Sequence, residues 1–509
     1  MRTHHHPRGD PLSNRRPHMT TADKTSPAGY RQLIAGEWVQ ADSGRHYDDM
    51  DPFTGEVFAT IPASNATDAT RAIDAAQAAF PAWAAMGARA RQALFLNAAN
   101  VLERRADEIV LLMARETGTA SPFSRFQIQW AVGLLRQAAG FPYLSGGEIV
   151  PSDTPGVFAM ALRKPLGVVA GISPWNGSLA LGFRTIVAPL ACGNTVVLKP
   201  SEDAPVCAGL LMGDIFTEAG FPPGVLNVVT HAPGEVGPIA DVLFEDRRVR
   251  AYNFTGSSTT GAALAARAGQ NLKRIALELG GYNPMLVMQD ADLDYAIDTA
   301  VFAAFFHQGQ ICMNTRKVLV HRSLYAQFLD RFVERAKAVK AGNPADPATR
   351  IGPLINDRAV ENVRRGIAQA VQRGARILAG GHHDGRCFQP TVLVDVPKEA
   401  PIHCEEVFGP VVIVEPFDTE DEAVEKANGT HYGLSASIMT ADVWNGVRLG
   451  GRIQSGMVNV NGPTMGGEPQ IPFGGVKDSG WARFGRWAIE HFTDLNLVTV
   501  SQDKRKFPI

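Results

Sequence analysis

Short apolar runs alternate with helix-length segments along most of the chain. In the first half, the apolar runs lie at 166–172, 195–199, 225–229 and 249–254. The segments between them have the length and the apolar spacing of helices. This alternation predicts parallel strands joined by right-handed helical crossovers, with helices on both faces of one sheet.

A second alternation follows in the C-terminal half. Apolar runs at 285–287 and 317–321 flank a helical segment at 293–306, and another helix is predicted over 324–339. A helix-rich stretch at 68–114 precedes the first unit and carries Ala and Leu at amphipathic spacing, so we expect it to cover the first sheet. The pattern therefore predicts an α/β protein with two sheets.

Length and composition narrow the class of protein. A chain of 509 residues exceeds what one hydrophobic core usually holds, which agrees with two or three units. The formal net charge is −2, with 45% hydrophobic and 20% charged residues. This balance shows no bias toward nucleic acids or anionic membranes, so the expected partner is a small molecule. No apolar run spans a bilayer and no segment resembles a signal peptide, so we expect a cytoplasmic protein.

The cysteine and histidine patterns favour neither disulfides nor a metal site. The five cysteines are an odd number without a Cys-x-x-Cys pair, which indicates a reducing compartment. His382-His383 and His403-Cys404 lack a second pair at suitable spacing, so we expect no metal. Residues 1–29 have the Arg, His, Pro and Ser content of a disordered tail. Its three-histidine run could bind metal, but an extension ahead of a start at Met19 is the better explanation.

Polar and turn residues follow three strands of the first unit. They are Pro174-Trp175-Asn176, Lys199-Pro200-Ser201-Glu202 and Thr255-Gly256-Ser257. In doubly wound sheets, ligands bind at the carboxyl ends of the strands. We therefore expect the three segments to meet in one crevice.

Two residues with the chemistry of a nucleophile and a base lie near the boundary between the units. Cys312 lies between an apolar helix and the strand at 317–321, but a lone cysteine is more often a buried small hydrophobe than a nucleophile. Glu278 ends a strand and precedes Gly280-Gly281, which permit a sharp turn, yet a surface carboxylate explains this position equally well. Neither residue identifies an activity by itself.

Several motifs in a defined order resemble the aldehyde dehydrogenase superfamily from about Leu33 to the C-terminus. They are Leu277-Glu278-Leu279-Gly280-Gly281, Gly309-Gln310-Ile311-Cys312, Phe254-Thr255-Gly256-Ser257, Glu405-Glu406-Val407-Phe408-Gly409-Pro410 and Pro472-Phe473-Gly474-Gly475, together with the segments at Trp175 and Lys199. Each motif is short, but their joint occurrence is specific. The resemblance implies a Rossmann-like cofactor domain, an α/β catalytic domain and a small β oligomerisation arm.

This resemblance implies domain limits. The NAD-binding domain would comprise 30–145 and 167–279, the catalytic domain 280–480, and the oligomerisation arm 146–166 and 481–509. The arm would pair a ribbon at 146–163 with a strand at 495–501. An exposed ribbon is an edge that a partner subunit covers, so a homodimer or homotetramer is expected.

The resemblance further implies oxidation of an aldehyde to the carboxylic acid. Cys312 would attack the aldehyde carbon as a thiolate, and the Asn176 amide with the Cys312 N–H would hold the oxyanion. Glu278 would activate the water that hydrolyses the thioester, which argues against a coenzyme A-acylating branch. From its position alone, Asn176 is also explained as the N-cap of the next helix.

A nicotinamide cofactor site is implied as well. Its residues would be Trp175, Lys199, Glu202, Gly256, Ser257, Glu406 and Phe408. Glu202 would accept hydrogen bonds from the adenosine ribose and repel a 2'-phosphate, which favours NAD, although members with Glu here also accept NADP. Without the resemblance, Gly256-Ser257 is an ordinary turn that lacks the Gly-x-Gly-x-x-Gly spacing. Glu406 and Phe408 would then be a solvated charge and a core aromatic.

The segments 307–313 and 474–480 resemble the branch that acts on benzaldehyde, salicylaldehyde and vanillin. Gly177 would leave room for a planar ring, and Arg184 would meet a ring hydroxyl or carboxylate. Trp130 and Phe183 are candidates to stack on the ring, although a core role is the better explanation for both from the sequence alone. For Arg184 the alternative is a helix-surface position.

Two departures from the family pattern, Tyr282 after Gly281 and the run that follows Cys312, leave the catalytic set intact. The alternative activity is that of a broad-specificity or aliphatic semialdehyde dehydrogenase, in which Arg184 holds a distal carboxylate. A cofactor-binding protein without turnover is the alternative from another class, and the complete catalytic set disfavours it.

Overall fold

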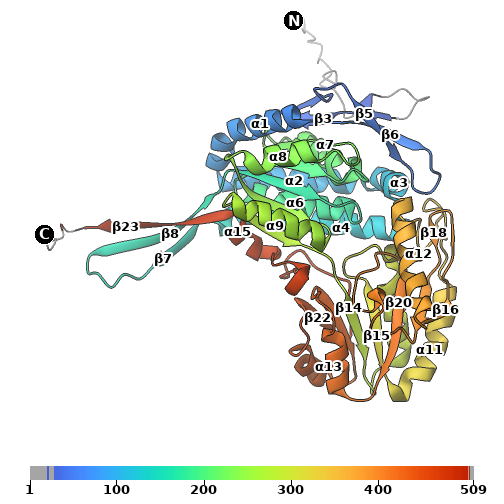
Figure 1. The fold of residues 1–509 in the computed structure, drawn as a ribbon. Helices are drawn as coiled ribbons and strands as arrows, with labels where there is room; N and C mark the ends of the chain where they lie inside the picture. Colours follow the sequence, from blue (N-terminus) through green and yellow to red (C-terminus); the bar gives the residue numbers. More distant parts are fainter. Residues whose placement is uncertain (1–19, 22–27, 503, 505–509) are drawn as a thin grey trace, which may run out of the picture.

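Two seven-stranded sheets dominate the molecule, whose computed structural model describes residues 20–21, 28–502 and 504 (Figure 1). Each sheet is flanked by helices, so the predicted α/β class is confirmed. In Figure 1 the two units lie one above the other, with a β-ribbon projecting sideways from the first. No helix in the described part of the chain is long and apolar enough to cross a bilayer.

The first sheet has the order β13-β12-β9-β10-β11-β3-β4. Its strands are β3 (Gln32–Ile34), β4 (Glu37–Val39), β9 (Val168–Ser173), β10 (Thr195–Pro200), β11 (Leu226–Val228), β12 (Val249–Thr255) and β13 (Arg274–Glu278). Strands β9 to β13 are parallel, whereas β3 and β4 extend the edge in antiparallel pairing. Parallel strands are covered on both faces, and every residue of β10 is accordingly buried.

Helices cover both faces of this sheet. The crossovers supply α6 (Ser178–Ala191), η1 (Val206–Leu210), α7 (Leu211–Ala219), α8 (Gly237–Glu245) and α9 (Ser258–Gln270). The N-terminal part supplies α1 (Ala66–Ala85), α2 (Ala88–Arg104), α3 (Ala106–Thr117), α4 (Ser121–Ala138) and the short α5 (Phe141–Leu144). Helix α6 is buried along its whole length because it lies between β9 and α4. Helix α4 therefore brings one face close to the loop before α6.

The second sheet has the order β16-β19-β20-β15-β14-β21-β22. Its strands are β14 (Asn283–Val287), β15 (Thr315–His321), β16 (Arg376–Ala379), β19 (Thr391–Val394), β20 (Val411–Phe417), β21 (Ser435–Met439) and β22 (Met457–Val460). The flanking helices are α10 (Leu293–Phe305), α11 (Arg322–Lys337), α12 (Asp357–Gln372), α13 (Glu420–Asn428) and α14 (Val443–Gly450). Smaller elements are β17 (His383–Asp384), β18 (Cys387–Phe388), α15 (Ala488–His491) and the single turns η2 (Phe306–Gly309), η3 (Pro401–His403), η4 (Lys477–Ser479) and η5 (Gly485–Trp487).

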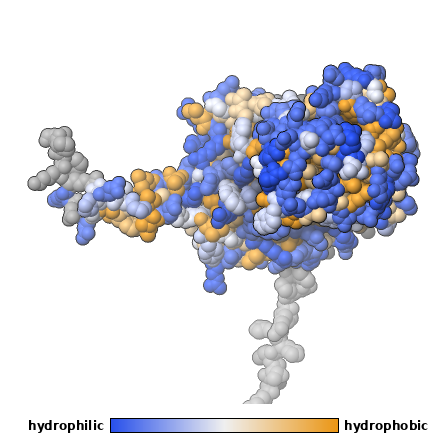
Figure 2. Space-filling view, turned by 90° about the horizontal axis from the view of Figure 1, so that it is seen from below, coloured by the Kyte–Doolittle hydropathy of each residue, from blue (hydrophilic) through white to orange (hydrophobic). Residues whose placement is uncertain are grey.

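The projecting ribbon consists of β7 (Gly147–Val150), β8 (Val157–Pro165) and β23 (Thr493–Ser501). Strand β23 pairs antiparallel with β8 from Thr493 opposite Pro165 to Ser501 opposite Val157. Apolar side chains remain exposed on it, with Ile149 70% and Leu497 67% accessible. Figure 2 shows these hydrophobic residues on the arm that stands away from the body.

The N-terminal segment forms a separate small sheet. Its strands are β1 (Thr20–Thr21), β2 (Ala28–Tyr30), β5 (His46–Met50) and β6 (Val57–Pro62), in the order β1-β2-β6-β5. Thr20–Thr21 pairs with Gly29 and Tyr30, so the tail predicted at 1–29 includes residues that backbone pairing orders. The remainder of that predicted tail lies outside the described residues.

Candidate active site

The loop that carries Cys312 is held in an unusual backbone conformation. It follows η2, where His307 and Gln308 have φ of 51° and 45° and Gly309 has φ of 70°. A Cβ on Gly309 would lie 2.1 Å from the carbonyl oxygen of Gly409, so only glycine fits. Beyond the turn, Asn283 Nδ2 donates to the Cys312 carbonyl at 2.8 Å. The loop is thus pinned from the second sheet, and the position of the thiol is defined.

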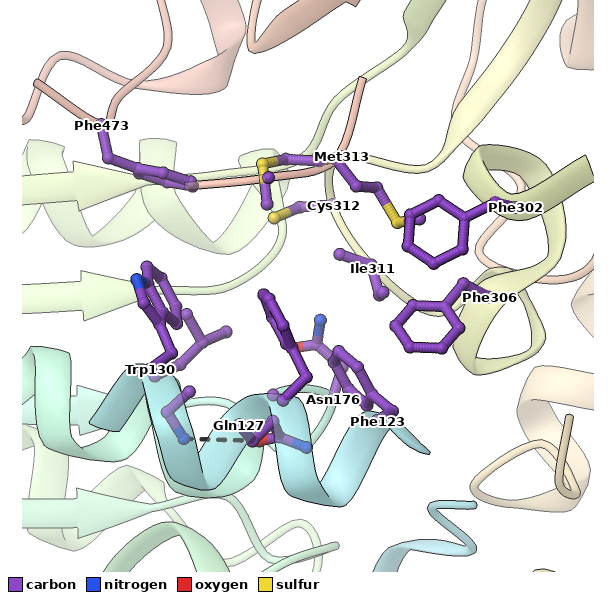
Figure 3. A pocket seen from close by; sticks show the side chains of 16 residues that line it. Phe123, Gln127, Trp130, Asn176, Phe302, Phe306, Ile311, Cys312, Met313 and Phe473 are labelled. Carbon is purple, nitrogen blue, oxygen red and sulfur yellow. Dashed lines mark hydrogen bonds between the residues drawn. The ribbon is translucent and has the colours of Figure 1, made fainter. Parts of the chain in front are cut away.

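Cys312 opens into an apolar pocket between the two units (Figure 3). Helix α4 supplies one wall, the loop before α6 a second, and the end of α10 a third. The lining residues are Phe123, Phe126, Gln127, Trp130, Asn176, Gly177, Ala180, Leu181, Phe302, Phe306, Ile311, Cys312, Met313, Met465, Gly466 and Phe473. Aromatic rings thus surround much of the space in front of the thiol.

Asn176 faces the cysteine loop and does not cap α6. The N-cap position of α6 is Gly177, which makes no side-chain capping bond. The buried Asn176 side chain instead donates through Nδ2 to the Gln310 carbonyl at 3.0 Å. The backbone N–H of Cys312 faces its own sulfur, where it favours the thiolate. Two hydrogen-bond donors therefore lie beside the thiol, as an oxyanion site requires.

Glu278 ends β13 and is buried at 2% exposure. Its Oε1 has no hydrogen-bond partner among the described residues and lies 3.1 Å from where a Cβ on Gly474 would stand. Burial raises the pKa of Glu278 to about 8, although Arg184 and Arg483 oppose the shift. A carboxyl group with this pKa is suited to take a proton from water near neutral pH.

Arg184 lies beside Glu278, although the sequence predicted a substrate contact. Its Nη1 is 3.8 Å from Glu278 Oε2, and its Nη2 donates to Thr255 Oγ1 at 3.2 Å. The guanidinium carbon is 4.6 Å from the ring centres of both Phe473 and Phe484. Arg184 is absent from the pocket lining and from the surface, so it acts on the site through Glu278.

The Cys312 thiol is protonated at rest. Burial raises its pKa to about 12, and the nearby positive charge of Arg184 only partly opposes this effect. The nucleophile therefore needs a proton acceptor when it reacts, because the thiolate is the reactive form.

The other predicted substrate residues have different positions. Gly177 lines the pocket, and a Cβ there would lie 2.9 Å from Leu181 side-chain atoms. Trp130 forms a wall, 6.1 Å from the Phe473 ring. Phe183 points into the core, where its ring lies 5.9 Å from Phe216. Phe183 is thus a packing residue, because it lies on the face of α6 that meets α7.

A second cleft, of about 380 Å³, is lined by Trp175, by α12 and by the segment at 401–408. Trp175 and Phe408 form its aromatic end, with ring centres 5.6 Å apart at 87°. Glu406 lines it, and its buried Oε1 has no hydrogen-bond partner among the described residues and lies 3.8 Å from Arg316 Nη2. Burial raises the pKa of Glu406 to about 7, with Arg316 opposing. Aromatic faces and an unsatisfied carboxylate fit a nicotinamide riboside.

Lys199 lies near the end of β10 and Glu202 just beyond it, and both share a partner that the sequence did not indicate, His231. Lys199 Nζ lies 2.9 Å from His231 Nε2, which in turn lies 3.6 Å from Glu202 Oε2. Burial lowers the pKa of Lys199 to about 8 and that of His231 to about 4. Burial disfavours the Glu202 charge, but a backbone N–H, His231, Lys199 and Arg358 outweigh it and keep its pKa low.

Gly256 and Ser257 lie at the junction of β12 and α9. Gly256 donates its N–H to the Glu278 carbonyl at 3.0 Å, and a Cβ there would lie 2.4 Å from the Phe254 ring. Ser257 is the N-cap of α9, and its Oγ accepts from Thr260 N. This geometry leaves the start of α9 open to an anionic group.

The structure adds residues that the sequence did not reveal. Helix α12 lines the second cleft with Arg358, Asn362 and Arg365, which recur at helical spacing on one face. Phe123 and Gln127 of α4 line the apolar pocket. Helical periodicity was the available signal, but it does not say which element a face will meet.

Comparison with known proteins agrees with this geometry. A family model described as the aldehyde dehydrogenase family matches residues 38–498. A vanillin dehydrogenase of Pseudomonas fluorescens is 41% identical over 478 residues, covering 94% of this chain and 99% of the relative.

Two solved structures extend the comparison. A salicylaldehyde dehydrogenase from Pseudomonas putida G7, complexed with salicylaldehyde, has a TM-score of 0.92 and 35% identity, covering 94% of this chain and 100% of that one. A betaine aldehyde dehydrogenase from Staphylococcus aureus in complex with NAD+ has a TM-score of 0.90 and 32% identity, covering 94% and 95%. The resemblance read from the motifs is thereby confirmed, and the chain belongs to the aldehyde dehydrogenase family.

Proposed function

We propose that this protein oxidises aromatic aldehydes to carboxylic acids with NAD. The observation that carries the proposal is the pocket in which Cys312, beside the Asn176 amide, faces a chamber walled by aromatic side chains. A planar apolar ring fits such walls by stacking and edge contacts. The names of the vanillin and salicylaldehyde relatives support the same substrate class.

In the first half of the reaction, the Cys312 sulfur bonds to the aldehyde carbon as the thiol gives its proton to a water molecule, which yields the thiohemiacetal as its oxyanion. The carbonyl oxygen takes the negative charge, and the Asn176 amide with the Cys312 N–H stabilises it. The carbon then loses hydride and becomes a thioester on Cys312. Because both donors are already in place, little reorganisation accompanies this charge.

In the second half, Glu278 accepts a proton from a water molecule that attacks the thioester carbon. The C–S bond breaks, the carboxylic acid leaves, and the Cys312 sulfur departs as a thiolate that takes up a proton to restore the resting thiol. The Glu278 Oε1 atom is free of protein partners among the described residues, so it is available to that water. Its pKa of about 8 makes it a base of suitable strength.

The pH dependence of turnover follows from this role. Glu278 must be ionised to act, so where hydrolysis limits the rate, we expect kcat to rise about tenfold between pH 7 and 9 around a pKa near 8. Arg184 lowers that pKa, so Arg184→Gln moves the limb to higher pH, while Arg184→Lys keeps the charge and moves it less. Steady-state pH profiles of the wild type and of the two variants measure the pH at which kcat rises. An unchanged limb in Arg184→Gln would contradict the coupling.

The residues around the second cleft fit NAD. Trp175, Glu406 and Phe408 would hold the nicotinamide riboside, Gly256 and Ser257 the pyrophosphate, and Lys199 and Glu202 the adenosine ribose. When bound, this cofactor accepts the hydride. The ionised Glu202 at the ribose end disfavours a 2'-phosphate, so we infer that NAD is preferred and that NADP is a weaker acceptor.

Glu202→Gln tests this preference, because it removes the charge and retains the size. We expect the ratio of kcat/KM for NADP to that for NAD to rise about tenfold. Dissociation constants from tryptophan fluorescence should change in parallel. Glu235→Gln is the matched control, since Glu235 is a nearby surface carboxylate paired with Arg45. An equal ratio in the two variants would refute the role of Glu202.

Aromatic and semialdehyde substrates differ in what they need from the pocket. A semialdehyde carries a distal carboxylate, yet the pocket lining contains no arginine or lysine, and Arg184 is engaged with Glu278. Rates with benzaldehyde, aliphatic aldehydes and succinate semialdehyde, with NAD and NADP, followed by nicotinamide absorbance, test the proposal. Preference for succinate semialdehyde over benzaldehyde would overturn it.

The exposed apolar residues of β7, β8 and β23 support a homodimer or homotetramer, because a partner subunit would bury them. Light scattering measures this state. All five cysteines are free, which supports a cytoplasmic location.

A further inference from the structure

The apolar pocket contains two buried polar groups that the mechanism does not use, Gln127 Nε2 and Trp130 Nε1, and Gln127 is the more deeply buried residue. Of the sixteen lining residues, only Gln127, Trp130 and Asn176 carry side-chain nitrogen or oxygen. Asn176 donates to the Gln310 carbonyl and is used by the mechanism as an oxyanion donor. Gln127 is fully buried, and its Nε2 has no hydrogen-bond partner among the described residues. Buried amide donors are nearly always paired, so this one indicates an acceptor that the chain itself does not supply.

The orientation of the Gln127 amide is set by α6. The side-chain Oε1 accepts from the backbone N–H of Ala180 at 3.4 Å, in the first turn of α6, where no other side chain caps the helix. Because an N–H donor must face an oxygen, the amide cannot be flipped without losing this bond. The NH2 group is therefore directed away from Ala180, and Gln127 is one of the residues that line the pocket.

Gln127 and Cys312 lie on opposite sides of the pocket. Figure 3 shows Cys312 at the top of the pocket and Gln127 at the bottom on α4, with labelled aromatic rings such as Trp130 and Phe306 at the sides. An aromatic aldehyde whose carbonyl carbon reaches the Cys312 sulfur must direct its ring away from the loop. A substituent on that ring is then carried toward α4.

The ligand chemistry follows from the surroundings of the NH2 group. It needs an oxygen acceptor, and the hydroxyl or alkoxy oxygen of a substituted ring provides one. A carboxylate would also accept, but its charge would lie among apolar walls without a cation in the lining. A neutral ring oxygen is therefore the better match.

We propose that Gln127 determines specificity by donating a hydrogen bond from Nε2 to a hydroxyl or alkoxy oxygen on the ring of the substrate. The preferred substrates are then ring-oxygenated benzaldehydes, in preference to benzaldehydes with apolar substituents of equal size. This inference rests on the proposed oxidation of aromatic aldehydes and specifies the substrates within that class.

Gln127→Met tests the proposal because methionine retains the length of the side chain and lacks the donor. The substrates are 3- and 4-hydroxybenzaldehyde, 4-methoxybenzaldehyde, and the methyl benzaldehydes as partners of equal size. For at least one hydroxy isomer, we expect the kcat/KM ratio of hydroxy to methyl substrate to fall about tenfold. A methoxy substrate, which only accepts, should follow the hydroxy compound of the same position.

Loss of the bond to Ala180 would affect all aldehydes alike, so only the ratio reports the donor. Equal losses for hydroxy and methyl substrates, or no loss, would overturn the proposal. Trp130→Phe is the matched control, since the indole Nε1 on the same helix also lacks a partner among the described residues. Loss of the hydroxy preference in that variant, and not in Gln127→Met, would also overturn it.

Binding without turnover gives a second readout. In the Cys312→Ala background, the dissociation constant of the favoured hydroxybenzaldehyde should rise about tenfold on adding Gln127→Met, while that of its methyl analogue stays within twofold. Wild-type oxidation of unsubstituted benzaldehyde separately tests the proposed function. That reaction does not need Gln127, so the proposed role of Gln127 and the proposed oxidation of aromatic aldehydes can each fail without the other.

Discussion

Cys312→Ala is expected to lower kcat for aldehyde oxidation by at least about 10⁴-fold, because no other residue can form the thiohemiacetal. The Cys312 sulfur is the nucleophilic atom in the apolar pocket, and the donors beside it act only on the oxyanion that its attack creates. Nicotinamide absorbance measures the loss, and electrospray mass spectrometry should show no acyl adduct.

A cysteine outside the pocket provides the control for this variant. Cys404 is half-buried beyond η3, its sulfur donates to the Pro401 carbonyl at 3.9 Å, and it lines neither cleft, so Cys404→Ala should keep near wild-type activity. Cys312→Ala should retain its fold and its affinity for NAD, since the second cleft does not include the thiol. Aldehyde-dependent NAD reduction by Cys312→Ala above about 1% of the wild-type rate would refute the mechanism.

Glu278→Gln should separate the two halves of the reaction. The thioester forms without Glu278, so we expect a burst of about one equivalent of reduced nicotinamide per active site, followed by turnover about 10² to 10⁴-fold slower than wild type. Stopped-flow absorbance measures the burst, and mass spectrometry identifies the acyl adduct on Cys312. A variant that loses the burst as well as turnover would show that Glu278 also acts before thioester formation.

Misfolding would also lower the activity of Glu278→Gln, but the pKa of Glu278 predicts that this variant is as stable as the wild type or more stable. Burial raises this pKa from 4.5 to about 8, so between these values the unfolded chain ionises Glu278 before the folded protein does. The stability of the folded state therefore falls as pH rises through this window. Glutamine does not ionise, so the melting temperature of Glu278→Gln at pH 8 should equal or exceed that of the wild type.

The order of elements and the central chemistry follow from local sequence. Alternating apolar runs predict both sheets, because a strand buried on both faces must be apolar along its length. Cys312 and Asn176 are 136 positions apart, yet each lies in a recognisable short motif, since the turn that presents it depends on neighbours such as Gly309. The pairing of the projecting ribbon with the C-terminal strand could likewise be predicted from the family resemblance of the sequence.

Which side chains are buried, and which residues they contact, is in contrast decided by the packing of segments far apart in the chain. Helix α4 lies beyond the helical stretch predicted at 68–114, so neither Gln127 nor Phe123 could be placed at the pocket before α4 was seen against α6. Arg184 and Phe183 are neighbours on one buried helix, but one meets Glu278 and the other Phe216. Helical spacing indicates that residues share a face and does not indicate what that face contacts.

Cys312 and Glu278 therefore illustrate what each level determines. The sequence by itself determined the family and the α/β class and singled out the nucleophile and base that we propose, because these depend on short motifs and periodicity. Only the tertiary structure decided that Glu278 has a pKa near 8, that Arg184 modulates it, and that Gln127 faces the pocket. The physical reason is that desolvation, charge and unmet hydrogen bonds arise from the packing of distant segments, which no local pattern records.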